Sequence, residues 1–418
     1  MWPRKQLDIG WSELSFGLWQ VVAAGPPLSS ESVVGSDWMP SDQAIVSLSV
    51  RTGWDLFLEA QRFEPGSEIL VSGVTIPDMV RIIEHHGLVT VPVAVDTDRL
   101  EPSLEDLERS ITPRTRAILV AHLFGARIDM EPIIRLARQH HLLVVEDCAQ
   151  AFVGRDYAGH DETDCSLFSF GPIKTATALG GAVLRIRDSA ICKRMVELQQ
   201  LYPVQTHRAY FSRVSKYTLF RVLGWPWVYG LLVRAYRLCG ADYDRKLGNA
   251  AHSFPGAEFF QQIRRQPCPA LMQLLQRRLA TFETRGAPEL RRRTVRGNQL
   301  SDLLPSGMVV GGQNETHTYW VMPLRVANSD EVLAALQRAG FDATSRSSLI
   351  VVRATEQKSS RETPAADWLA ETIFLPNGHD IPDSEWTRVS IILRHVARPV
   401  ATHIESEPSP VISVSVSS

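Results

Sequence analysis

Between Ser41 and Asp188, apolar runs alternate with amphipathic helical patterns, and this alternation restricts the possible folds of this 418-residue chain more than any other feature. Strand-like runs such as ILVSGV, RAILVAHLF and HLLVVED are separated by segments with helical spacing, such as PDMVRIIEHHG and EPIIRLARQHH. This pattern predicts an α/β fold with a largely parallel sheet and helices on both faces. Such sheets bind ligands at the carboxyl ends of their strands, so polar residues there are the first candidates for a functional site.

The length of the chain predicts more than one domain. We expect residues 1–255 to form a large domain, with an aromatic and basic insertion at about 205–250 and an irregular lead-in with short elements over residues 1–40. Residues 256–403 alternate strand and helix patterns again and predict a smaller C-terminal α/β domain. The Ser-rich end, residues 404–418, has the composition of a disordered tail.

Composition excludes several classes of function. The 44 Lys and Arg residues nearly balance the 46 Asp and Glu residues, which argues against binding a nucleic acid by overall charge. The five cysteines form no CxxC pair and have no histidine at metal-ligand spacing, so we expect reduced thiols and no metal site. The N-terminus lacks the unbroken apolar stretch of a signal peptide. These features predict a cytoplasmic protein.

The first candidate for chemistry is the end of the apolar run HLLVVED. Asp147 closes this predicted strand, where a carboxylate points into the ligand crevice. Gln150, three residues later, can turn toward the same crevice. The alternative is that Asp147 is a solvated loop residue.

The second candidate is Lys174, which lies between two strand-like segments among small and apolar residues. An amine that is kept from water loses its proton readily and can attack a carbonyl to form a Schiff base. Ser169 supplies a hydroxyl suited to a phosphate oxygen, and Gly180 and Gly181 allow the backbone to pass close to a bound ring. The alternative is a structural lysine on a loop.

These parts fit one cofactor, pyridoxal 5'-phosphate (PLP). PLP needs a lysine for its aldehyde, a carboxylate for its pyridinium nitrogen and donors for its phosphate. Lys174 and Asp147 suit the first two tasks. Helix N-termini favour phosphate groups, so Thr52 and Gly53, at the start of the predicted helix WDLFLEAQ, are candidates for the third. Plain N-capping by Thr52 is the alternative.

Three motifs in order carry a family resemblance: AHLFG at 121–125, EDCAQ at 146–150 and FSFGPIK at 168–174. Together they resemble the DegT/StrS family of PLP-dependent sugar aminotransferases, in which an EDxAQ strand end precedes an FSFxxxK segment that holds the cofactor lysine. The resemblance is weaker elsewhere but covers most of the chain. It implies a fold-type-I PLP-dependent transferase that forms a homodimer with active sites at the subunit interface.

The resemblance also implies a reaction: transfer of an amino group from an amino acid, usually glutamate, to a nucleotide-linked keto-sugar. Lys174 would form the Schiff base and shuttle the proton, while Asp147 would pair with the pyridine nitrogen. Gln150 would contact the ring hydroxyl side, Ser169 the phosphate, and Asn249 the phosphate of the partner subunit. A lysine at 174 argues against the dehydratase branch, which has histidine there. Two other classes stay open, namely a non-transaminating PLP enzyme and a non-catalytic PLP-binding regulatory protein.

The chain departs from the family at two places. Residues 50–54 take the place of the glycine-containing turn that binds the cofactor phosphate in the family. The position at which the family has an aromatic residue stacked on the cofactor lies near Ile76 in this chain. Stacking would then be apolar contact only, or come from another residue.

The most hydrophobic segment, residues 219–238, has only 12 uncharged residues between Arg221 and Arg234. It is too short to span a membrane, which takes about 20 apolar residues. Its tryptophans and arginines are typical of weak contact with a membrane surface, which would make the protein membrane-peripheral. Packing within the dimer or over the active site is the interpretation that the sequence favours over membrane contact. The arginines between 264 and 296 predict a solvated basic helix face.

Overall fold

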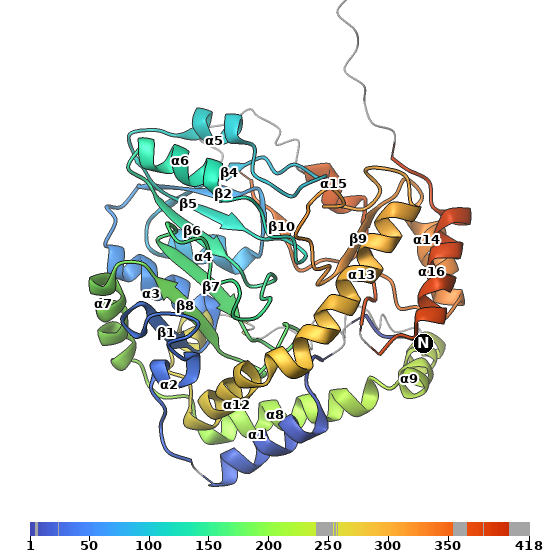
Figure 1. Ribbon diagram of the computed structural model, residues 1–418, viewed down its shortest axis with the longest axis horizontal. Helices are drawn as coiled ribbons and strands as arrows, with labels where there is room; N and C mark the ends of the chain where they lie inside the picture. Colours follow the sequence, from blue (N-terminus) through green and yellow to red (C-terminus); the bar gives the residue numbers. More distant parts are fainter. Residues whose placement is uncertain are drawn as a thin grey trace, which may run out of the picture.

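The structure is a computed structural model that describes residues 1–400 except 5, 6, 24, 240–253, 255, 257, 354–365 and 379. Its centre is a seven-stranded sheet in the order β1-β8-β7-β6-β5-β2-β4 (Figure 1). The strands are β1 (Ala44–Ser47), β2 (Glu68–Ser72), β4 (Val89–Val93), β5 (Thr115–Ala121), β6 (Leu143–Asp147), β7 (Cys165–Ser169) and β8 (Ala182–Ile186). Neighbours from β7 to β4 are parallel, and β8 is antiparallel to both β7 and β1. The mostly parallel sheet predicted from the alternating pattern is confirmed.

Helices cover both faces of this sheet, which explains why its strands are apolar runs without alternation. Ile69 and Val71 of β2 face a core shared with α3 (Val50–Gln61), α4 (Pro77–His85) and α7 (Ser189–Gln200). Leu70, between them, faces the opposite core with α5 (Leu104–Ser110) and α6 (Glu131–Gln139). Successive strand residues point to opposite faces, so one strand serves both cores.

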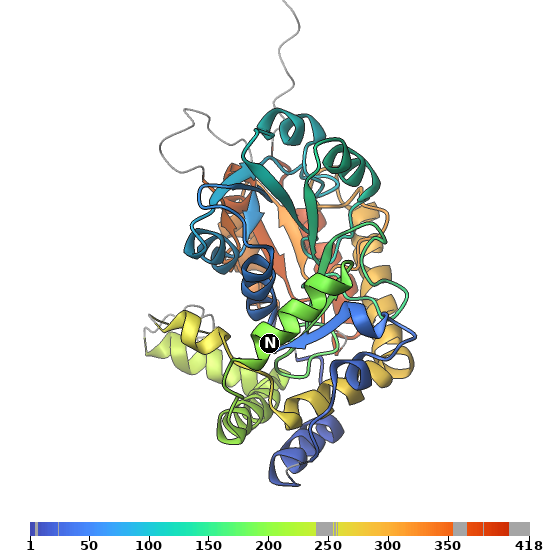
Figure 2. The same cartoon turned by 90° about the vertical axis from the view of Figure 1, so that its left-hand side faces the viewer.

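A third core lies around the chain segment that follows β7. Phe168 and Phe170 pack there with buried residues of the N-terminal helices and of two later helices. These helices are α1 (Trp11–Ala23), α2 (Ser30–Val34), α8 (His207–Leu223) and α12 (Pro269–Ala280). Figures 1 and 2 place α1 at the opposite end of the molecule from α5 and α6. The lead-in predicted to be irregular with short elements, residues 1–40, contains a helix of 13 residues, α1.

The C-terminal part has its own core, built on an antiparallel pair of strands, β9 (Met322–Arg325) and β11 (Thr372–Leu375). Helices α13 (Ala287–Leu303), α14 (Ser329–Arg338) and α16 (Asp383–Val396) pack on this pair. Helix α13 runs between the large sheet and these elements (Figure 1). The boundary predicted between residues 255 and 256 stays a prediction, and the predicted tail lies outside the described residues.

The remaining elements are mostly short. They are η1 (Ser41–Gln43), β3 (Val74–Thr75), α9 (Pro226–Leu238), α11 (Phe259–Ile263), η2 (Phe282–Gly286), β10 (Ile350–Val351) and α15 (Ala366–Ala370). Strand β10 pairs antiparallel with β3, which joins the C-terminal part to the large sheet domain.

Candidate functional site

Asp147 is the last residue of β6 and lines a small pocket at the carboxyl ends of the strands. Ile76, His122 and Gln150 line the same pocket. One Asp147 carboxylate oxygen accepts a hydrogen bond from the Ala149 N–H at 3.0 Å. Burial raises the pKa of Asp147, and this hydrogen bond and the nearby positive charges favour its ionised form. The strand end therefore holds a carboxylate at the ligand edge of the sheet, as the sequence predicts.

Gln150 lies in the turn after β6 and is fixed by a backbone contact. Its side-chain oxygen accepts a hydrogen bond from the Phe124 N–H at 2.7 Å. The two ends of β5 and β6 are thereby tied together beside the pocket. The amide NH₂ of Gln150 points away from that bond, because oxygen and nitrogen lie on opposite sides of the amide carbon.

Lys174 lies in the loop between β7 and β8, and its side chain is half-buried. Its N–H donates to the Gly171 carbonyl at 3.0 Å. The loop ends at Gly181, whose φ of 87° is accessible to glycine at little cost. Burial lowers the pKa of Lys174 to about 8, the Asp147 carboxylate opposes this lowering, and the Arg51 charge adds to it. A larger share of this amine is thus neutral and nucleophilic near neutral pH than for an exposed lysine.

Trp320 supplies an aromatic ring at the Lys174 amine, although the sequence does not indicate this. The Nζ atom lies 4.2 Å from the Trp320 ring centroid, and Trp320 Nε1 donates to the Ile173 carbonyl at 3.1 Å. Trp320 stands 146 positions after Lys174, in a segment whose pattern only predicts a strand. The Thr318 hydroxyl, in the same segment, donates to the Gly125 carbonyl at 2.9 Å, so this segment also holds the turn after β5.

Arg293 on α13 reaches the same loop. Its Nε donates to the Thr318 carbonyl at 2.9 Å, and its Nη2 lies 3.5 Å from the Thr175 hydroxyl. Burial lowers the pKa of Arg293 to about 10. The solvated face predicted for the arginines between 264 and 296 is wrong for Arg278 and Arg296, which are both buried.

Thr52 and Gly53 lie in the first turn of α3, where the structure gives both a packing contact. The Thr52 hydroxyl donates to the Ile263 carbonyl at 2.8 Å, and the N-cap is Ser49, which accepts from the Thr52 N–H at 3.2 Å. A Cβ at Gly53 would lie 2.5 Å from a Leu184 methyl, so glycine lets α3 approach β8 closely.

Two further groups complete the phosphate side of the predicted site. Arg51, in the same helix turn, carries the charge that acts on both Lys174 and Asp147, and its Nε donates to Asp78 at 2.5 Å. Ser169 ends β7 and is half-buried, at the same sheet edge as Asp147. Asn249, predicted to contact the phosphate, lies outside the described residues.

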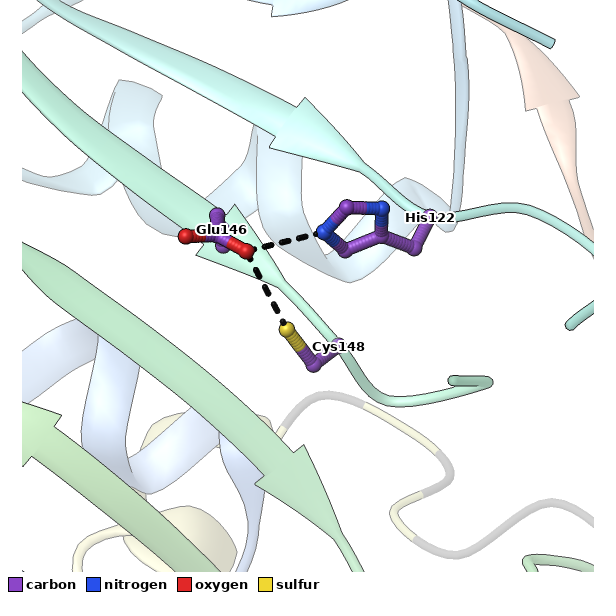
Figure 3. Close-up of side chains that lie close together, drawn as sticks. All are labelled: His122, Glu146 and Cys148. Atoms are coloured by element: carbon purple, nitrogen blue, oxygen red, sulfur yellow. Dashed lines mark hydrogen bonds and ion pairs between the residues drawn. The ribbon is translucent and has the colours of Figure 1, made fainter. Parts of the chain in front are cut away.

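Next to Asp147, a buried cluster of His122, Glu146 and Cys148 fixes the ends of β5 and β6 (Figure 3). The Ile128 N–H donates to His122 Nδ1 at 3.1 Å, so Nε2 carries the proton and donates to Glu146 at 3.0 Å. The Cys148 thiol lies 3.8 Å from the same carboxylate oxygen.

Glu146 accepts several more hydrogen bonds from the segment that follows β6. Its donors include the Tyr157 hydroxyl at 2.5 Å, the His160 N–H at 2.8 Å and the Thr163 hydroxyl. These bonds hold the pKa of Glu146 at about 2, although burial alone would raise it. The three side chains of the cluster therefore satisfy one another and position the strand end that carries Asp147.

The structure thus brings Asp147, Gln150, Lys174 and Ser169 to one edge of the sheet, with Arg51 close enough to influence two of them. The donor set fits PLP, because it offers an amine of lowered pKa and a carboxylate at the ends of adjacent strands. The Thr52 hydroxyl donates its hydrogen bond to the Ile263 carbonyl instead of pointing to this edge of the sheet.

Comparisons with known proteins show what this chain is similar to. Residues 36–220 match the model of the DegT/DnrJ/EryC1/StrS aminotransferase family, which confirms the family resemblance over the part that holds all three motifs. GDP-perosamine synthase of Caulobacter vibrioides (strain ATCC 19089 / CIP 103742 / CB 15) is 36% identical over 165 residues, which cover 38% of this chain and 44% of that relative. The match therefore spans less than half the length of that relative.

Solved structures match nearly the whole chain. The aminotransferase TlmJ from Streptoalloteichus hindustanus has a TM-score of 0.68 at 19% identity, covering 94% of this chain and 98% of that chain. Spr1654 from Streptococcus pneumoniae, in its PLP-form, has a TM-score of 0.66 at 14% identity, covering 94% and 97%. At these identities the likeness shows the fold alone, and it confirms the predicted α/β fold.

Proposed function

We propose, from the match of residues 36–220 to the DegT/DnrJ/EryC1/StrS aminotransferase family, that this chain is a PLP-dependent aminotransferase. We propose that its amino donor is an amino acid, with glutamate as the first candidate, and that its acceptor is a nucleotide-activated keto-sugar. The name of the curated relative, GDP-perosamine synthase, supports a nucleotide-linked sugar as the substrate class. We further propose a homodimer, as the family resemblance implies.

The observation that carries this proposal is the pairing of Lys174 and Asp147. A half-buried amine with a pKa of about 8 and a half-buried carboxylate lie at the same edge of the sheet and act on each other's pKa. When bound, PLP supplies an electron sink for the bonds at the amino-bearing carbon. Lys174 would hold the aldehyde carbon through a Schiff base and carry the proton during transfer.

Asp147 has to be ionised to keep the ring nitrogen protonated, and neighbouring groups favour the ionised form, although the net shift of its pKa is upward. Burial raises its pKa, but the Ala149 N–H and the charges of Lys174 and Arg51 act in the opposite direction. Gln150 would face the ring hydroxyl with its free NH₂ group, since its oxygen is bonded to Phe124.

On the phosphate side, Ser169, Thr52, Gly53 and Asn249 remain the proposed contacts. Because the Thr52 hydroxyl is bonded to Ile263, Thr52 and Gly53 would act by placing the first turn of α3, and Arg51 on that turn would supply the positive charge. Ile76 lines the pocket as an apolar contact, and Trp320 is the aromatic ring at the amine.

The test uses the purified full chain and PLP. Wild type is expected to develop a visible absorption band that resists dialysis, and Lys174→Met is expected to lack it. The matched control is Lys193→Met, which changes an exposed lysine of α7, one of six lysines in the chain, and should keep the band. L-glutamate should then discharge the band, and a nucleotide-linked keto-sugar should restore it.

Each step separates this proposal from its rivals. Absence of the band in wild type contradicts any PLP-dependent activity. A band that glutamate and other amino acids leave unchanged indicates a non-catalytic PLP-binding protein. A band that amino acids alter, but that no keto-sugar restores, indicates a non-transaminating PLP enzyme.

A further inference from the structure

Helix α9 has one face packed against the protein and an apolar face exposed to solvent. Tyr229 and Val233 are buried on the inner face, and the Tyr229 hydroxyl donates to Asp342 at 2.6 Å. The amino terminus of Met1 also donates to the Pro226 carbonyl at 2.8 Å. These contacts fix the rotation of α9 about its own axis, so its outer face is determined.

The outer face of α9 carries large apolar side chains at helical spacing. Trp227 is 66% exposed, Leu231 is 62% exposed and Leu238 is 81% exposed. Steps of four and seven residues place them on one side of a helix. Trp225, just before α9, is also exposed, and its ring lies 6.4 Å from that of Trp227. A surface helix normally turns such a stripe inward, so this arrangement marks an interaction surface.

The chain segment that carries this stripe has charges of one sign. No Asp or Glu occurs between Glu197 and Asp242, whereas that stretch holds six basic residues. They are Arg208, Arg213, Lys216, Arg221, Arg234 and Arg237. Arg208, Lys216 and Arg234 have exposed side chains, and Arg234 lies within the apolar stripe itself.

The charge decides between the two occupants that an apolar helix face can have. In a two-fold contact with a second copy of the chain, this surface would meet itself, and the basic residues of this segment would face the same basic residues of the copy. An anionic bilayer supplies the missing negative charge, while Trp and Leu side chains enter the region between headgroups and acyl chains. We propose that the outer face of α9, with Trp225, docks the protein on the surface of an anionic phospholipid bilayer.

In this proposal α9 lies parallel to the membrane surface and does not cross the bilayer. No helix in the part of the chain that the structure describes is long and apolar enough to cross a bilayer. Long Arg side chains within such a stripe extend toward the headgroups while their methylene groups stay among apolar neighbours. The inference does not depend on the aminotransferase proposal, because α9 contributes no residue to the candidate site.

The test is flotation of the full chain with vesicles. Wild type is expected to float with vesicles that contain phosphatidylglycerol and much less with vesicles of phosphatidylcholine alone, and salt should weaken the binding. Trp227→Ser combined with Leu231→Ser should lower the partition coefficient about tenfold or more, because two exposed apolar groups are lost. Arg234→Glu should weaken binding to the anionic vesicles only.

The control is Ile391→Ser, which removes an exposed apolar side chain from α16 and should leave flotation unchanged. Far-UV circular dichroism, measured on every variant, shows that the protein is folded and is read separately from binding. Wild type that does not float overturns the proposal, as does a double variant that floats like wild type. If wild type does not bind vesicles, and light scattering gives the double variant a lower molar mass than wild type, the outer face of α9 contacts a second copy of the chain instead.

Discussion

Replacing Asp147 with Asn is expected to make Lys174 of the cofactor-free protein more reactive toward acylating reagents. The pKa of Lys174 is lowered from 10.5 to about 8, chiefly by burial, and the Asp147 carboxylate is the largest influence that opposes this. Asparagine keeps the size of the side chain but removes its charge. The protonated amine then loses its stabilising partner, so the pKa of Lys174 falls further.

The size of the effect follows from the pKa of Lys174. At about pH 7.5, an amine with a pKa of about 8 is about one quarter neutral, whereas one with a pKa of 10.5 is neutral in about one molecule per thousand. A further fall of about one unit, equivalent to ~1.4 kcal/mol, raises the neutral fraction to about three quarters. Acylation of Lys174 near neutral pH should therefore become about threefold faster. Transamination should be lost in the same variant, because the proposed partner of the ring nitrogen is gone.

The assay is competitive acetylation with limiting acetic anhydride over a pH range that brackets both values, with peptides quantified by mass spectrometry. Lys193, which is exposed on α7, serves as the reference peptide in both proteins. The reactivity of Lys174 should show a midpoint near pH 8 in wild type and a lower midpoint in Asp147→Asn. A wild-type midpoint near 10.5, or a midpoint that moves upward in the variant, would refute the reasoning.

Three other predictions concern stability and cofactor affinity. The pKa of Glu146 lies at about 2 in the folded protein, below its ordinary value of 4.5, so its contribution to stability is present above pH 4.5 and is lost as pH falls toward 2. Glu146→Gln should thus lower the free energy of unfolding by about 3 kcal/mol at neutral pH, and the difference from wild type in urea titrations should shrink below pH 4.5. Gly53→Ala should destabilise the protein by about 1–2 kcal/mol, because the new methyl group overlaps the fully buried side chain of Leu184. This overlap outweighs the gain in helix propensity. Equal unfolding midpoints for the variant and wild type would contradict the prediction. Trp320→Leu should weaken PLP binding up to about tenfold while Trp320→Phe preserves it, as measured by titration of the visible band, and equal affinities for the two variants would argue against a role for the ring.

The sequence predicts the parts of the site that depend on local pattern. Asp147 is predictable because a run of apolar residues that ends in an acid marks a strand end, and strand ends of a parallel sheet are ligand edges. Lys174 is predictable because a charge between two buried strands is unusual. Both inferences need only short stretches of chain, and the order of the three motifs then gives the family resemblance that residues 36–220 bear out.

Local sequence patterns do not predict the hydrogen-bond partners of hydroxyl groups or the packing of segments that are distant in the chain. Thr52 has the expected place at a helix start, yet its hydroxyl is bonded to Ile263, which lies 211 positions later. Helix α1 escapes prediction because its Gly and Ser residues weaken the helical pattern, whereas contacts with α8 and α12 stabilise it in the fold. Tertiary packing decides both cases, and no local propensity encodes it.

The segment 316–320 illustrates how the C-terminal part completes a site whose chemistry lies in the large sheet domain. Within five residues it bonds Gly125 after β5 through Thr318, and Ile173 before Lys174 through Trp320. Both contacts end on loops that carry family motifs, one beside Gln150 and one beside the amine. A change in the position of the C-terminal part therefore acts on the surroundings of Lys174 and Gln150 together. The family match ends at residue 220, so this chain shapes its site with residues that lie beyond the matched region.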